Sequence, residues 1–248
     1  NEAFVIDEST KAKLVAEDPR SVEVIKLFLS GRDIKRYQQP KSDKYLIFTR
    51  RGIDIEQYPA IKKYLYQFKE KLEPKPNDFS GNEWNGRKPG SYKWYEIQDA
   101  VDYFEEFEKP KVMLPDISLI CQALIDNNQF YCVNTAYIIP GLTYSDLGIL
   151  NSNLILFFYA NLTQTIRGGY FRFIRQYLEQ IPFIKTSILD DNVKEIIQIK
   201  SQNPAADTTA LEAEIDLMVY KLYNLTWEEV KIVDPEFAMR EEEYEKVG

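Results

Sequence analysis

The segment Phe28-Leu29-Ser30-Gly31-Arg32-Asp33-Ile34-Lys35-Arg36-Tyr37 combines an apolar start, a Ser-Gly pair typical of a turn and three cations within five positions. Cations that converge on one surface suit contacts with the phosphates of a polyanion. The same residues equally fit the exposed end of a helix in contact with solvent. The segment alone therefore leaves both interpretations open, and the flanking sequence has to decide between them.

Outside this segment, the hydrophobic periodicity alternates between strand and helix spacing as far as residue 185. We expect strands at 44–49, 111–114, 118–125, 129–133 and 136–139, and helices at 60–69, 96–107 and 145–161. The last three strands, with the turn residues Asp126-Asn127-Asn128 between the first two, are typical of a β-meander. Residues 73–95, rich in Pro, Gly, Asn and Lys, are expected to form a long loop.

The C-terminal part of the chain has a different pattern. Residues 189–202 and 208–223 both show helical spacing, and Gln202-Asn203-Pro204 interrupts them. Thr226-Trp227-Glu228-Glu229 resembles a capping box that opens a last short helix. The sequence therefore predicts an α+β fold, with a mixed-sheet domain over residues 1–185 followed by a helical hairpin over 186–248 that acts as a spacer or docking tail.

Composition excludes several classes of site. The 248 residues are 44% hydrophobic, enough for a packed core, and contain no histidine, which rules out His-based triads, His-Cys zinc sites and imidazole bases. Cys121 and Cys132 are too few for a disulfide framework, so we expect a reduced, cytoplasmic protein with both thiols in the core. The apolar run 147–162 is short and interrupted by asparagines, so no membrane span is expected. We expect the chain to be a piece of a longer polypeptide.

Charge is unevenly distributed along the chain. The formal net charge is −8, yet residues 26–93 hold 16 basic and 8 acidic side chains, and residues 166–185 hold 4 and 1. Residues 186–248 hold 6 basic and 15 acidic side chains. Because phosphate contacts are local and screened within about 10 Å, an acidic protein can still carry a basic DNA-binding face.

No catalytic or metal-binding motif stands out. The glycine-rich phosphate loops of nucleotide-binding proteins are absent. Asp116 could be the first acid of a metal-dependent nuclease, but the acid and lysine that such a site needs do not follow it, and a turn residue at a strand end is the expected role. The acidic run between Asp99 and Glu108 fits a solvated helix face.

Two stretches combine cations with aromatic residues. One is Gly86-Arg87-Lys88-Pro89-Gly90-Ser91-Tyr92-Lys93-Trp94-Tyr95, inside the expected loop. The other is Arg167-Gly168-Gly169-Tyr170-Phe171-Arg172-Phe173-Ile174-Arg175. Such loops suit recognition of phosphates and base edges, because arginine can bond guanine through two hydrogen bonds and aromatic rings can stack. An exposed loop with packed aromatics remains the alternative.

The opening segment, Phe28 to Tyr37, resembles the start of the TaqI-like specificity domain, the target-recognition domain of type IIG restriction-modification enzymes and related N6-adenine DNA methyltransferases. Further stretches resemble the same family in the same order, and the resemblance spans residues 22–232. They are Trp94-Tyr95-Glu96-Ile97, Lys109-Pro110-Lys111, Asn134-Thr135-Ala136-Tyr137, Leu147-Gly148-Ile149-Leu150-Asn151-Ser152, Gln180-Ile181-Pro182, and Glu214-Ile215-Asp216 through Val219-Tyr220-Lys221-Leu222-Tyr223-Asn224-Leu225-Thr226.

The resemblance implies a non-catalytic module that reads double-stranded DNA for a methyltransferase domain elsewhere in the parent chain. That domain would bind S-adenosylmethionine, and a nuclease domain would bind Mg²⁺; neither the Pro-Pro-Tyr adenine-pocket motif nor a cofactor-binding glycine turn is in this sequence. The residues that the resemblance assigns to DNA contacts are Arg32, Lys35, Arg36, Arg50, Arg51, Arg87, Lys88, Tyr92, Lys93, Trp94, Arg167, Tyr170, Arg172 and Arg175.

A second hypothesis comes from a different class. The acidic total and the exposed helical hairpin also fit a scaffold domain that docks a catalytic partner without touching DNA. The two hypotheses differ in their response to salt, because binding driven by phosphates weakens steeply as salt rises and apolar docking does not. A third hypothesis, a self-contained metal nuclease built on Asp116, predicts nicking of plasmid DNA in the presence of Mg²⁺ or Mn²⁺.

Overall fold

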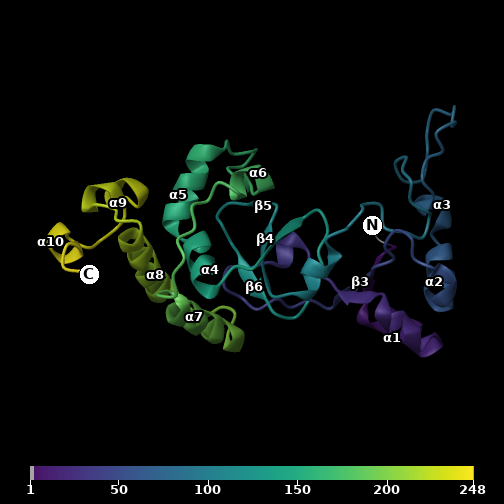
Figure 1. Ribbon diagram of the computed structural model, residues 1–248, viewed down its shortest axis with the longest axis horizontal. Helices are drawn as coiled ribbons and strands as arrows, with labels where there is room; N and C mark the ends of the chain where they lie inside the picture. The colour runs from purple at the N-terminus through teal and green to yellow at the C-terminus, as the bar shows by residue number, and fades with distance from the viewer. Residues whose placement is uncertain (1–2, 248) are drawn as a thin grey trace. The chain divides into compact units, whose positions relative to one another are not determined.

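Residues 3–247 are described by the structure, a computed structural model, and they divide into two compact units (Figure 1). Unit 1 comprises 1–29 and 42–108, and unit 2 comprises 30–41 and 109–248. The chain therefore leaves unit 1 after Leu29, contributes twelve residues to unit 2 and returns at Ser42. No helix within 3–247 has the length and apolar content needed to cross a bilayer.

Unit 1 is a small antiparallel sheet with helices and a long loop. Its elements are β1 (Val5–Asp7), α1 (Glu8–Glu17), η1 (Pro19–Glu23), β2 (Ile25–Leu27), β3 (Lys44–Ile47), η3 (Ile55–Gln57), α2 (Pro59–Tyr66), α3 (Lys69–Leu72) and η4 (Phe104–Glu108). The strand order is β1-β3-β2, so β3, which covers residues 44–47 of the strand predicted over 44–49, lies at the centre of the sheet. The predicted long loop is confirmed.

The helix predicted over 96–107 is wrong. The backbone of 93–97 is held against 49–52 instead: Ile97 N donates to Thr49 O at 2.8 Å, and Thr49 Oγ1 donates to Tyr95 O at 2.5 Å. The buried Glu96 carboxylate accepts hydrogen bonds from Gly52 N and Lys93 N. Tertiary hydrogen bonds thus replace the helical ones, and only η4 keeps a helical turn.

Unit 2 begins with the short turn η2 (Gly31–Asp33) and then has two small antiparallel sheets and most of the helices. Its elements after η2 are β4 (Lys111–Pro115), β5 (Ile117–Ser118), β6 (Leu124–Asp126), β7 (Ala136–Pro140), α4 (Tyr144–Asn151), α5 (Asn153–Leu162), β8 (Phe171–Arg172), α6 (Arg175–Leu178), α7 (Asp190–Gln202), α8 (Thr209–Leu222), α9 (Trp227–Val233) and α10 (Glu241–Tyr244). The α+β class is confirmed. All the named strand pairs are antiparallel.

The predicted β-meander is wrong in topology. The sheet order is β6-β4-β7, so β4 lies at the centre and pairs with both later strands. Residues 129–133 form no strand, because Asp126 accepts hydrogen bonds from Asn128 N and Phe130 N and bends the chain away. The same carboxylate forms a fully buried ion pair with Lys111 at 2.6 Å, across the β4–β6 pair.

The helix predicted at 145–161 is two helices. Ser152 has extended dihedral angles (φ −71°, ψ 158°), and its side chain caps α5 by accepting a hydrogen bond from Ile155 N. Thr143 and Asp146 form a capping box at the start of α4. The break lets two apolar helices of unit 2 pack in different directions, and both contribute to one core together with β4.

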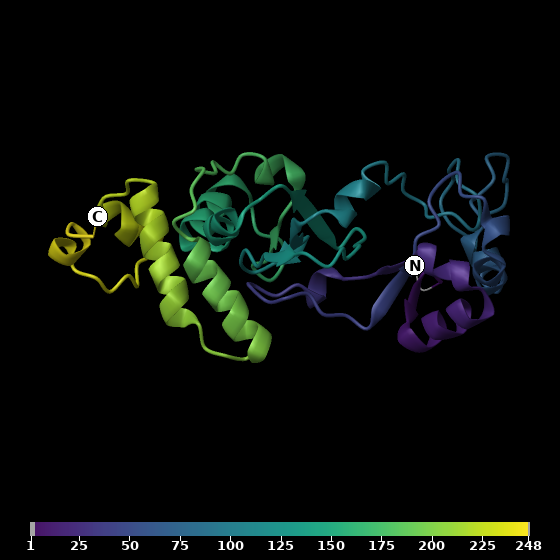
Figure 2. The ribbon, with the colours of Figure 1, turned by 60° about the horizontal axis from the view of Figure 1, so that its bottom comes forward.

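The predicted tail helices are confirmed as α7, α8 and a short α9 whose capping box is formed by Thr226 and Glu229. In Figure 2, α7 and α8 lie side by side. Leu189, Val193 and Ile196 are fully buried and belong to the same core as α4. Gly148 lets α4 and α7 pack closely, because a Cβ at position 148 would lie only 3.0 Å from Val193 Cγ2 on α7. A spacer or docking role for 186–248 stays a prediction.

Because α7 completes the core of unit 2, we predict that Ile196→Ala lowers the free energy of unfolding by about 2–5 kcal/mol. Ile188→Ala is the matched control, since that side chain is 51% exposed and precedes α7; its effect should stay within about 0.5–1 kcal/mol. Urea unfolding of both variants measures this. Equal, small effects would show that α7 is not part of the cooperative unit.

Candidate nucleic-acid interface

The basic segment 30–41 is held in unit 2 by its non-basic residues. Ile34 and Tyr37 are fully buried, and Tyr37 N donates to Ala123 O at 3.1 Å with a positive φ of 58°. Gly31 N donates to Thr135 Oγ1, and a Cβ on Gly31 would lie 2.0 Å from Thr135 O, so only glycine fits. With these positions buried, Arg32 and Lys35 are left exposed.

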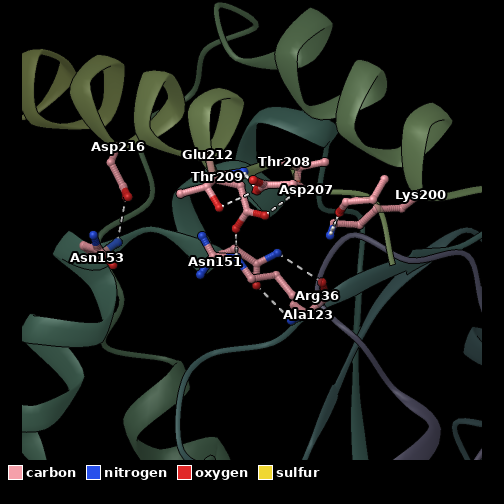
Figure 3. A network of polar contacts seen from close by, with 11 residues as sticks. Arg36, Ala123, Asn151, Asn153, Lys200, Asp207, Thr208, Thr209, Glu212 and Asp216 are labelled. Atoms are coloured by element: carbon pink, nitrogen blue, oxygen red, sulfur yellow. Dashed lines mark hydrogen bonds and ion pairs between the residues drawn. The ribbon is translucent and has the colours of Figure 1, made fainter. Parts of the chain in front are cut away.

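Arg36 takes a structural position within this segment. Its Nε lies 2.9 Å from Glu212 Oε2 on α8, an ion pair whose alignment falls short of a hydrogen bond. Figure 3 shows Arg36 reaching toward Glu212 next to the pair formed by Asn151 and the backbone of Ala123. Both partners are about one-fifth exposed. The ion pair links the basic segment to α8 in the tail. Arg36, which the resemblance assigns to DNA contact, is therefore already paired within the protein.

Asp216 anchors α8 to the start of α5 in the same network (Figure 3). Its carboxylate accepts a hydrogen bond from Asn153 N at 2.7 Å. Burial raises the pKa of Asp216 to about 6, although the Asn153 hydrogen bond and the Arg36 charge act in the opposite direction. Since the folded pKa lies above the ordinary value of 3.8, the stability that Asp216 contributes is full below that value and is lost as pH rises through about 6.

We therefore predict that Asp216→Asn is more stable than the parent protein above pH 7, by on the order of 2 kcal/mol, because it still accepts from Asn153 N without a buried charge. The difference between variant and parent should shrink as pH falls from about 7 toward 4. Urea unfolding across this range measures it. Asp191→Asn, on the exposed face of α7, serves as control. A difference that does not change with pH would contradict the assignment.

Arg167 and Tyr170 lie at the tip of a hairpin in unit 2. Ile166 N donates to Tyr170 O at 2.7 Å, and Gly168 and Gly169 turn the chain with φ of 88° and 79°. Such angles favour glycine, which explains the pair. Arg167 is exposed, and Tyr170 is 40% exposed. A cation and an aromatic ring thus project from a tight turn.

The base of this hairpin is rigid. β8 pairs with β5, and Tyr159 stacks on Phe173 with ring centroids 4.7 Å apart. Tyr159 Oη donates to Arg172 O at 2.6 Å and accepts from Ile174 N, and burial raises the pKa of this phenol to about 12, so it stays a donor. Arg172 forms an ion pair with Asp116 at 3.1 Å while remaining about half exposed. Arg175 lies beyond the hairpin, exposed, and pairs with Glu179.

Arg87 is the central link of the long loop in unit 1. Its guanidinium donates to four backbone carbonyl oxygens, those of Leu72, Lys93, Trp94 and Glu96, at 2.6–3.0 Å. Burial lowers the pKa of Arg87 from its ordinary value. All these hydrogen bonds are made within the protein, so Arg87 holds the long loop together. Its contact with DNA stays a prediction.

Tyr92 has a similar inward position. It is 4% exposed, lies beneath Arg87 with 4.4 Å from guanidinium carbon to ring centroid, and donates its hydroxyl to Lys88 O. Lys88 and Lys93 are exposed. Arg50 and Arg51 are exposed as well: Arg50 lies over the Phe104 ring, and Arg51 donates to Gln98 O at 2.8 Å.

Trp94 belongs to an aromatic group that the sequence analysis did not identify. Its ring packs edge-to-face with Tyr66 and Tyr95, at centroid distances of 5.8 and 5.4 Å. Lys69 Nζ lies 5.8 Å from the Trp94 ring and 5.7 Å from that of Tyr66. Tyr66 is 61% exposed. A signal was available, because Tyr66 falls off the apolar stripe of α2 formed by Ile61 and Leu65.

We predict that Arg87→Lys, which keeps the charge but cannot reproduce the forked hydrogen bonds, destabilises unit 1 by about 1–3 kcal/mol. The loop 73–103 should then be cut faster by trypsin at low protease concentration, and the unfolding midpoint should fall. Lys88→Ala removes the neighbouring exposed cation and should change neither quantity. A silent Arg87→Lys variant would show that the carbonyl contacts do not hold the loop.

The assigned DNA-contact residues thus fall into two sets. Arg50, Arg51, Arg87, Lys88, Tyr92, Lys93 and Trp94 lie in unit 1, and Arg32, Lys35, Arg36, Arg167, Tyr170, Arg172 and Arg175 lie in unit 2. Of the 14, Arg36, Arg87 and Tyr92 are engaged inside the protein, whereas most of the others are exposed. Their contact with nucleic acid stays a prediction.

Neither a metal centre nor a reactive thiol is evident in the described residues. Within 3–247, no group of three or more acidic or cysteine side chains is placed to hold a metal ion. The Asp116 carboxylate pairs with Arg172. Burial raises the pKa of Cys121 and of Cys132 to about 12, so both thiols stay protonated and unreactive near neutral pH.

Comparisons with known proteins show the family of the chain through a family model, and they show relatives in sequence and in fold. The family model described as the TaqI-like C-terminal specificity domain matches residues 26–183. The chain is 26% identical over 234 residues to the type II methyltransferase M.BstVI of Geobacillus stearothermophilus, covering 89% of this chain and 38% of that protein. The fold is similar to that of the type IIL restriction-modification enzyme MmeI, solved in complex with DNA, with a TM-score of 0.62, 16% identity, and coverage of 98% of this chain and 34% of that one. The chain therefore spans little more than a third of the length of either relative.

Proposed function

Because the chain belongs to the family of TaqI-like C-terminal specificity domains, we propose that it recognises a short sequence in double-stranded DNA for a restriction-modification enzyme. The family match carries this proposal, since it covers residues 26–183 and includes both the basic segment and the glycine hairpin. The fold likeness to a restriction-modification enzyme solved with DNA supports it. In this proposal the chain is a reader and performs no catalysis itself.

The glycine hairpin is the element best suited to read bases. Its turn directly precedes β8 in the two-stranded β5–β8 sheet, and a two-stranded ribbon fits the major groove, where each base pair presents a distinct pattern of donors and acceptors. Arg167 can reach guanine O6 and N7 with two hydrogen bonds, and the exposed Tyr170 ring can pack against a thymine methyl group or a sugar. The Tyr159 contacts and the β5–β8 pair keep this tip in a fixed orientation, which limits the entropy lost on binding.

The exposed cations away from the hairpin tip suit the sugar-phosphate backbone. Arg32, Lys35, Lys88 and Lys93 are all exposed. Phosphate contacts set the orientation of a protein on the duplex and carry no sequence information themselves. In this arrangement the cations determine affinity and the hairpin determines sequence preference.

The catalytic work would belong to other domains of a longer polypeptide. The curated relative M.BstVI is a methyltransferase, and this chain corresponds to 38% of it. We propose that the reader positions an adenine-N6 methyltransferase domain, and in a type IIG parent also a nuclease, on the target site. S-adenosylmethionine and Mg²⁺ would then be bound by those domains, while residues 186–248 would dock against them.

The proposal predicts that the purified chain binds a pool of random duplexes and that sequencing of the bound fraction shows a short enriched motif. Affinity should fall by at least tenfold between about 50 and 200 mM salt. Arg167→Ala should reduce binding to the enriched motif by about 5- to 100-fold while leaving affinity for random duplex nearly unchanged. Fluorescence anisotropy measures both affinities.

Lys246→Ala is the control for loss of one exposed cation, because it lies in the acidic tail far along the chain from the hairpin. It should leave both affinities unchanged. Absence of any DNA binding near 50 mM salt would refute the proposed function for this chain. It would favour the scaffold hypothesis instead, whereas DNA binding that is insensitive to salt would contradict the assigned phosphate contacts.

A further inference from the structure

A pocket of about 270 Å³ lies within unit 2, between the basic segment and the end of α7. Its lining comes from two segments that are more than 150 positions apart in the sequence. The lining residues are Arg32, Asp33, Lys35, Gln38, Gln39, Lys41, Lys200, Ser201 and Pro204. Lys41, Lys200 and Ser201 have no role in the DNA contacts considered so far.

The walls of this pocket are tied together by contacts within the protein. Gln38 Nε2 donates to Pro204 O at 3.1 Å, which links the basic segment to the turn after α7. The Arg36–Glu212 ion pair makes a second link, from the same segment to α8. The buried Tyr37 lies between these two anchors in sequence. The pocket is therefore formed in advance of any ligand.

The charge of the lining is strongly positive. Four of the nine lining residues are basic and one, Asp33, is acidic. The Asp33 carboxylate is already engaged, because it accepts hydrogen bonds from both Ser30 N and Ser30 Oγ. Arg32, Lys35 and Lys41 are exposed, and none of the three forms an ion pair with any residue in 3–247. Their charges are available to an external anion.

Lys200 brings a fourth charge from the opposite wall. Its Nζ lies 3.5 Å from Ala206 O, at the limit of a hydrogen bond. Asp207 is the acid that follows Lys200 in this turn. Its pKa is lowered mainly by hydrogen bonds from Thr209, and the charge of Lys200 lowers it further. The carbonyl end of α7 contributes about half a negative charge. The four full cations outweigh the charges of Asp33 and Asp207 and this partial charge together.

We infer that this pocket binds a backbone phosphate of the DNA, with Lys41 and Lys200 as phosphate contacts beside Arg32 and Lys35. The inference rests on the proposed function and extends it to the helical tail. The donors fit a phosphate: ammonium and guanidinium groups surround it, and the Gln39 amide and Ser201 hydroxyl add neutral donors. The acidic tail thus contacts DNA at one point, the end of α7.

The test uses the full chain and fluorescence anisotropy on both the enriched and a random duplex. Lys200→Ala and Lys41→Ala should each weaken binding to both duplexes by about 3- to 10-fold at low salt and leave their ratio unchanged. Each substitution should also reduce the slope of log affinity against log salt by about 0.9, the value for one phosphate contact. Lys200→Arg should retain most of the affinity.

Lys194→Ala is the matched control on the same helix, since Lys194 is exposed and pairs with Asp190. It should bind both duplexes like the parent protein. A parent protein that binds DNA, together with Lys41→Ala and Lys200→Ala variants of unchanged affinity and slope, would overturn the inference and leave the proposed function intact. A parent protein that binds no DNA would overturn both.

A second arm distinguishes DNA phosphate from a free anion. Inorganic phosphate, added at constant ionic strength, should not raise the melting temperature of the parent protein at concentrations near 1 mM. If it does so, if Lys200→Ala abolishes the effect, and if DNA affinity is unaltered in that variant, the pocket is a site for a small anion and the inference is wrong.

Discussion

The insertion of residues 30–41 into the core of unit 2 is the constraint on which the rest of the structure depends. Tyr37 reaches zero exposure in the same core as β4, α4 and α7. Gly31 packs so closely against Thr135 that no side chain fits there. Although residues 30–41 interrupt unit 1 in the sequence, the core of unit 2 is incomplete without them. The burial of Ile34 and Tyr37 therefore fixes the position of the basic segment within unit 2.

This constraint separates residues that shape the protein from residues that face outward. In segment 30–41, burial of Ile34 and Tyr37 leaves Arg32 and Lys35 on the surface. In the hairpin, Phe171 and Phe173 pack around Tyr159, and Arg167 and Tyr170 remain at the tip. In both cases a rigid apolar base supports a small set of exposed polar groups. Recognition loops on rigid scaffolds lose little entropy on binding and can vary without loss of the fold.

The predictability of each element follows from the range of the interactions that form it. The tail helices and the capping box at Thr226 depend on spacing within one turn of helix, and the sequence predicted them correctly. The helix expected over 96–107 had apolar residues at helical spacing, yet Thr49 and Gly52, more than 40 positions away, take the hydrogen bonds of its first residues. The same limit applies to β4 (111–115), whose central place in its sheet depends on pairing with both β6 (124–126) and β7 (136–140).

The predictability of the site residues also depends on how far apart in the sequence their contacts lie. The exposed cations of segment 30–41 were recognisable as a basic cluster, whereas the inward hydrogen bonds of Arg87 depend on carbonyl groups of residues 72, 93, 94 and 96 that no motif marks. Lys200 could not be associated with Lys41 from the sequence, because contacts between residues far apart in the sequence, such as that of Gln38 with Pro204, bring their segments together. The exposure of Tyr66 could have been predicted from the sequence, because an aromatic residue off the buried stripe of an amphipathic helix is expected to face solvent.

Electrostatics reconciles an acidic chain with a polyanionic ligand. At about 0.15 M salt, charges more than about 8 Å apart in solvent barely interact, so those of the acidic side chains in residues 186–248 that lie farther than this from a bound phosphate have little effect on it. What matters is the local balance, and the lining of the pocket at the end of α7 has four cations and one carboxylate, with Asp207 as a second acid close to Lys200. An acidic tail also repels DNA wherever it lacks such a pocket. In the proposed function, contact with the duplex is therefore expected only where cations converge, because the net charge of −8 opposes contact with phosphates at other places on the surface.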